Sequence, residues 1–74
     1  MNKLKPISPE KLIKIIKKLG FEEIRQKGSH KFFRNPEGKT TIVPFHKGEN
    51  ISKGLLLKIL KDIDITREEF LDLI

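Results

Sequence analysis

The stretch RQKGSHKFFRNPEGKTTIVPFH, residues 25–46, decides the fold because it carries the signals of a β-sheet. Within it, SHKFFR alternates with the period of a strand, so that successive side chains point to opposite faces. One face carries His30, Phe32 and Arg34, and the other carries Ser29, Lys31 and Phe33. At most one of the two adjacent phenylalanines can therefore be exposed.

A turn and two further strands are predicted around this central strand. NPEG, residues 35–38, favours a turn because Pro36 presets the backbone and Gly38 suits the exit. The β-branched run in KTTIVPF predicts a returning strand that stops at Pro44, which cannot donate to a ladder. A short strand from residue 21 to about residue 26 precedes the central one, so we expect a meander of three antiparallel strands.

The segment SPEKLIKIIKKLGF, residues 8–21, predicts a helix before the sheet. Ser8 can cap it, Pro9 fits its first turn, and Gly20 can end it. At about 100° per residue its leucines and isoleucines share one face and its lysines the other. One face therefore belongs to the core, while the cationic face is solvated.

Two helices are predicted after the sheet. ISKGLLLKILKDI, residues 51–63, can be capped by Ser52, and TREEFLDLI, residues 66–74, contains a capping box of Thr66 and Glu69. The order predicts an α+β fold, α-β-β-β-α, in which helices cover one face of a three-stranded antiparallel sheet and a short extra helix follows. We expect residues 1–74 to form a single domain, because a chain of this length supports only one core.

The composition favours a soluble cytoplasmic protein. The chain has no cysteine, so neither disulfides nor thiolate metal sites are predicted. Its first residues, MNKLKPISPE, lack the apolar core of a signal peptide, and no segment approaches the roughly 20 apolar residues of a membrane span. The basic helix predicted within residues 8–21, about eleven residues that end before Gly20, has branched aliphatic residues and no interfacial aromatic residue, so we expect no membrane attachment.

The charge is unevenly distributed along the chain. Residues 1–58 contain fourteen Lys and Arg against five acids, a net +9, whereas residues 59–74 contain two against five, a net −3. A basic body attracts polyanions, of which nucleic acid is the commonest. The alternative is that the lysines only keep a small domain in solution, and composition does not decide between the two.

The two histidines are the candidates for acid–base chemistry, because imidazole is the side chain that exchanges protons near neutral pH. His30 lies among basic residues and could take the 2′-OH proton of a ribose while the cations hold the adjacent phosphate, or it could simply be a half-exposed residue of a strand. His46 could supply a second proton-transfer group, or only orient its loop. No metal site is predicted, since no carboxylate or further imidazole stands at ligand spacing from the histidines, and we expect no cofactor or small-molecule ligand.

Three motifs in order, KLIKIIKKLGF, RQKGSHKFF and IVPFHKGENISKGLLLKILKDIDITREEF, resemble the HicA family of toxins from prokaryotic toxin–antitoxin pairs. The resemblance implies a fold like that of a double-stranded-RNA-binding domain and ribosome-independent cleavage of mRNA. It also implies that His30, in GSH, is catalytic and that a HicB-type antitoxin is the inhibiting partner. The residues expected to contact RNA are Lys27, Gly28, Ser29, Lys31, Arg34 and Lys47.

A non-catalytic RNA-binding module with the same fold is the alternative hypothesis. Such a module needs a lysine cluster at the start of the last long helix, to reach the phosphates of duplex RNA. This chain has SKGLLLKIL there, with Lys53 alone at the start. The sequence therefore favours an endoribonuclease that acts without a metal.

Overall fold

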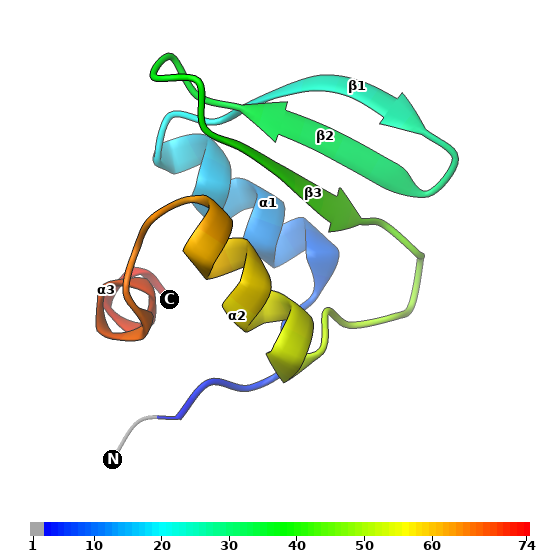
Figure 1. Cartoon of the computed structure of the whole chain (residues 1–74). Helices are drawn as coiled ribbons and strands as arrows, with labels where there is room; N and C mark the ends of the chain where they lie inside the picture. The colour runs from blue at the N-terminus through cyan, green and yellow to red at the C-terminus, as the bar shows by residue number, and fades with distance from the viewer. Residues whose placement is uncertain (1–2) are drawn as a thin grey trace.

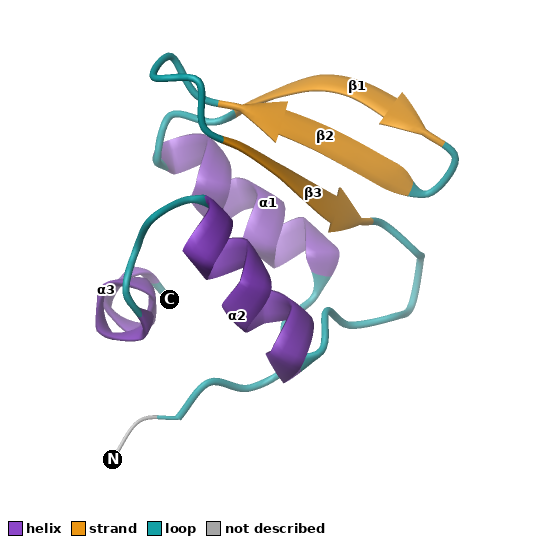
Figure 2. Cartoon of the chain, in the orientation of Figure 1, coloured by secondary structure: helices purple, strands orange, loops and turns teal. Residues whose placement is uncertain are grey.

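The computed structural model describes residues 3–74 and contains three helices and three strands (Figure 1). In chain order these are α1 (Pro9–Lys18), β1 (Glu22–Lys27), β2 (His30–Arg34), β3 (Thr40–Pro44), α2 (Lys53–Asp62) and α3 (Arg67–Leu73). The strands form one antiparallel sheet in the order β1-β2-β3. The helices lie on one side of this sheet and leave its other face open (Figure 2). The predicted fold class is confirmed.

Each helix begins at the side-chain cap that the sequence predicts. The hydroxyl oxygens of Ser8 and Ser52 each accept a hydrogen bond of 3.2 Å from a first-turn N–H of α1 and α2. At α3, the Glu69 N–H donates to the Thr66 hydroxyl at 3.0 Å, and the Glu69 carboxylate accepts from the Thr66 N–H at 2.8 Å. These bonds satisfy N–H groups that have no partner within a helix.

The core lies between the helices and the inner face of the sheet. Phe33 is fully buried, whereas its neighbour Phe32 is only partly buried on the opposite face. The other side chains without exposed surface are Leu12, Ile16, Val43, Leu56 and Ile59. The alternation predicted for β2 therefore holds, and burial of its inner face fixes the register of the sheet.

Both ends of the described chain pack against the helices. Ile7 and Ile51 form an antiparallel bridge through two backbone hydrogen bonds of 3.1 and 2.6 Å. The buried side chain of Phe70 attaches α3 to the core. No helix among residues 3–74 is long and apolar enough to cross a membrane.

Two side-chain contacts attach the sheet to the end of α2. The Thr41 hydroxyl donates to the Asp62 carboxylate at 3.0 Å, and the Lys39 ammonium donates to the Asp64 carboxylate at 2.8 Å. The second contact raises the pKa of Lys39 and lowers that of Asp64, chiefly through the hydrogen bond itself. The side chains of Lys39 and Asp64 are both exposed to water, so we expect their ion pair to add little to stability. We assign it a role in positioning the turn between β2 and β3.

A bulge interrupts the pairing of β1 with β2. The register shifts between Glu23 and Arg25, and the residue between them, Ile24, is 47% exposed. A bulge adds one residue to one strand and changes the direction of the side chains that follow it. Arg25 consequently pairs with Phe32, on the open face of the sheet.

Candidate active site

A tight turn between β1 and β2 positions His30. Lys27 ends β1, Gly28 and Ser29 form the turn, and His30 begins β2 as the cross-strand partner of Lys27. Gly28 has φ +59°, a value that a two-residue hairpin favours at its first turn position and that glycine adopts without strain. The GSH tripeptide therefore places an imidazole directly beside the two-residue turn that joins β1 to β2.

His30 is exposed on the open face of the sheet, at its outer end. Its neighbours across the two ladders are Lys27 on β1 and Pro44 on β3. Beyond Pro44, the Phe45 N–H donates to the Ser29 carbonyl at 2.6 Å, so the chain leaving β3 stays beside the turn. A substrate can therefore reach the imidazole from the open side of the sheet.

His46 and Lys47 lie in the loop that leaves this end of β3. The Glu49 N–H donates to the His46 carbonyl at 3.0 Å and closes a turn in which Gly48 has φ +82°. Both side chains are exposed. The hydrogen bond of Phe45 with Ser29 brings this loop to the same end of the sheet as His30. Seven of the eight predicted site residues therefore lie at this end, and all but Lys31 lie away from the inner face: Lys27, Gly28, Ser29, His30, Lys31, His46 and Lys47.

Lys31 is separated from His30 because it lies on the inner face of β2. Its ammonium is 3.2 Å from the Glu23 carboxylate and 4.9 Å from the centre of the Phe45 ring. Only 20% of its side chain is exposed. Lys31 therefore contacts Glu23 and Phe45 on the inner side of the sheet, at the end where β2 begins. Its contact with RNA remains a prediction.

Arg34 is separated from His30 by the length of β2. It ends the strand, where it pairs with Glu22, and four residues of extended chain span about 13 Å. An RNA that contacts both side chains would have to lie along the strand. Arg34 therefore does not flank His30 as the sequence suggested, and its contact with RNA stays a prediction.

Arg25 is a candidate that the sequence did not single out. Its guanidinium carbon lies 4.5 Å from the centre of the Phe32 ring, on the open face that also carries His30. Arginine over an aromatic ring forms a flat cationic platform, of the kind on which bases stack. The sequence does not indicate that Arg25 lies over Phe32, because the bulge determines which face of the sheet the Arg25 side chain occupies.

The site combines an exposed imidazole with nearby cations and a platform of Arg25 and Phe32. Such a set can exchange a proton and hold a phosphate, the two tasks needed for cleavage of a ribose phosphodiester. Among residues 3–74, no three His, Cys, Asp or Glu side chains are grouped so that they would hold a metal ion.

A family model described as "HicA toxin of bacterial toxin-antitoxin" matches residues 9–65 of the 74-residue chain. The match includes α1, the whole sheet and α2, and it ends before α3. No match was found among curated proteins.

Proposed function

The chain belongs to the family of HicA toxins of bacterial toxin–antitoxin pairs, and from this we propose that it is an endoribonuclease that cleaves mRNA independently of the ribosome. The observation that carries the proposal is the exposed His30 beside Lys27, at the turn of the β1–β2 hairpin. We further propose a HicB-type antitoxin as its inhibitor.

In the proposed reaction, the neutral His30 imidazole takes the proton of a ribose 2′-OH. The resulting alkoxide attacks the adjacent phosphorus, and the bond from phosphorus to the 5′-oxygen breaks. A proton from His46 or from water neutralises the departing oxygen. The products are a 2′,3′-cyclic phosphate and a free 5′-hydroxyl, so atoms and charge balance.

The cations around His30 have a separate task in this mechanism. Lys27 lies directly across the ladder from His30, and Lys47 lies in the loop at the same end of the sheet. Their ammonium groups attract the phosphodiester and stabilise the negative charge that develops on it. Arg25 and Phe32 supply a stacking surface for a neighbouring base.

The substrate requirement gives a direct test of this chemistry. An RNA oligonucleotide should be cleaved in excess chelator, because the nucleophile is activated by an imidazole, whereas its fully 2′-deoxy counterpart should stay intact because it lacks that nucleophile. Gel separation and mass spectrometry of the products should show cyclic phosphate ends. RNA binding without cleavage would instead identify a non-catalytic RNA-binding module, and cleavage of the deoxy strand would exclude the mechanism.

The salt dependence of RNA binding tests the cationic site. We expect Lys27→Ala to flatten the slope of log affinity against log salt by about 0.7 for any RNA sequence, the value for one lost phosphate contact. Lys31→Ala is the comparison variant: Lys31 is also predicted to contact RNA, but its ammonium is engaged with Glu23 on the other face, so its loss should change the slope less. Fluorescence anisotropy at several salt concentrations measures both slopes. An equal or larger effect for Lys31→Ala would show that the RNA backbone reaches Lys31 as closely as it reaches Lys27.

The surface around Lys27 and His30 could also be the site at which the antitoxin inhibits the toxin directly. An acidic antitoxin surface that covers Lys27 and His30 would gain charge complementarity and exclude RNA at once. Covering His30 alone is sufficient, because the proposed chemistry depends on this exposed imidazole.

A further inference from the structure

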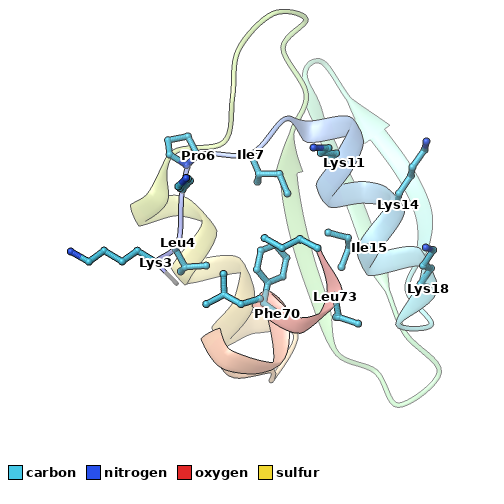
Figure 3. A pocket seen from close by; sticks show the side chains of 13 residues that line it. Lys3, Leu4, Pro6, Ile7, Lys11, Lys14, Ile15, Lys18, Phe70 and Leu73 are labelled. Atoms are coloured by element: carbon cyan, nitrogen blue, oxygen red, sulfur yellow. The ribbon is translucent and has the colours of Figure 1, made fainter. Parts of the chain in front are cut away.

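A second surface lies away from the sheet, where the two ends of the chain meet. The N-terminal segment, one side of α1 and α3 enclose an open groove of about 770 Å³ (Figure 3). Its floor is apolar and consists of Leu4, Ile7, Ile15, Phe70, Leu71, Leu73 and Ile74. Leu73 and Ile74 are 45% and 67% exposed, so the groove keeps large apolar side chains in water.

Lysines stand on both edges of this groove. Lys11, Lys14 and Lys18 form a row on α1 that is about 10 Å long, and Lys3 extends from the opposite edge in Figure 3. Lys5 also lines the groove. Among residues 3–74, no acidic side chain lines the groove and none pairs with these five lysines within 4.0 Å.

The groove is built largely from residues outside the family match. The match begins at Pro9 and ends at residue 65, whereas residues 3–7 form one wall, and α3 and Ile74 contribute the exposed part of the floor. Neither wall is needed to place His30, which lies at the outer end of the sheet. The groove is therefore separate from the candidate active site.

We propose that this groove binds an acidic amphipathic helix of the antitoxin, with apolar side chains on the floor and carboxylates against the two edges of lysines. The proposal rests on the toxin–antitoxin assignment and is independent of the cleavage mechanism. An apolar strip between two cationic edges matches a helix that carries an apolar face and acidic flanks, a common mode of recognition in grooves. Because the groove lies among the helices and His30 lies on the open face of the sheet, the groove would give the antitoxin a second attachment point and raise its affinity through effective concentration.

Two other occupants fit the groove less well. A bilayer surface is flat and cannot reach the floor of a hollow between lysine side chains. A second copy of this chain would have to supply an acidic helix, and the acidic helix of this chain, α3, already buries its Phe70 in its own core. An antitoxin helix is free of both objections.

A labelled synthetic peptide provides the test, with Leu along one helix face and Glu along both flanks. We expect it to bind the full chain by fluorescence anisotropy and to bind more weakly as salt is added. The same peptide with Lys in place of Glu should bind at least about tenfold more weakly, since the groove would repel it. Equal binding of the two peptides would overturn the proposal.

Matched variants locate the binding. Lys14→Glu and Leu73→Asp should each weaken the acidic peptide about tenfold, because each removes one of the two complementary features. Lys17→Glu, on the same helix, and Leu57→Asp, a leucine of similar exposure on α2, lie outside the groove and should change binding less than about twofold. With the cognate antitoxin in place of the peptide, the same ranking is expected for the rate of dissociation.

Two other outcomes would each identify a different occupant of the groove. Binding to phosphatidylserine vesicles that Leu73→Asp abolishes, without peptide binding, would identify a membrane site. Self-association that Leu73→Asp abolishes would identify a second copy as the occupant. Neither groove variant should alter RNA cleavage, because neither residue lies at the His30 end of the sheet, so this proposal and the proposed activity can fail separately.

Discussion

Replacing His30 with alanine should lower the rate of RNA cleavage by about 10²–10⁴-fold, the range that a positioned acid–base group contributes. The loss should reach the background rate if no second group can take the 2′-OH proton. The fold should be unchanged, because the side chain is exposed and supplies no core contact. Single-turnover cleavage of a labelled RNA, together with circular dichroism, measures both properties.

His46→Ala is the matched control for this experiment. Its imidazole is also exposed and belongs to the loop at the same end of the sheet. A smaller loss than for His30→Ala would identify His30 as the principal base, and an equal loss would indicate that the two imidazoles act together. A His30→Ala variant that keeps more than about a tenth of the activity would place the chemistry elsewhere.

Phe33→Ala should give the largest loss of stability, about 3–5 kcal/mol in the free energy of unfolding. Its ring has no exposed surface, and it fills the space between the centre of the sheet and the helices. Since small domains are stable by only about 5–15 kcal/mol, this change should leave much of the protein unfolded. Urea unfolding followed by circular dichroism measures the change.

Phe32→Ala is the control, because it removes the same ring from the opposite face of the same strand. Phe32 is partly exposed beneath Arg25, so the variant should cost much less than Phe33→Ala. The comparison separates burial from the intrinsic preference of phenylalanine for strands. Equal losses for the two variants would show that the open face contributes to stability as much as the core does.

The elements of this fold could be predicted because their signals are local. Ser8, Ser52 and Thr66 each begin a helix through bonds made within a few residues. The burial of Phe33 and the partial exposure of Phe32 follow from the two-residue period of a strand. The end of β3 at Pro44 also agrees with the missing N–H of proline.

The composition of the site was less predictable, because it depends on which strands pair and in which register. Nothing local indicates the bulge at Ile24, yet that bulge places Arg25 over Phe32. The ion pair of Lys31 with Glu23 likewise joins residues of two strands. The groove is lined by residues from both ends of the chain, so no local sequence pattern within either end predicts it.

The pairing of Ile7 with Ile51 has a consequence for the order of events during folding. Every strand of the sheet pairs with its neighbour in the sequence, so the hairpins that carry His30 require only short loops to close. The Ile7–Ile51 bridge joins distant parts of the chain, and its closure carries a larger entropic cost. We therefore expect the His30 end of a newly synthesised chain to form before the groove does. If the antitoxin uses both proposed surfaces, it could then bind a newly made chain at the His30 end before its second attachment point exists.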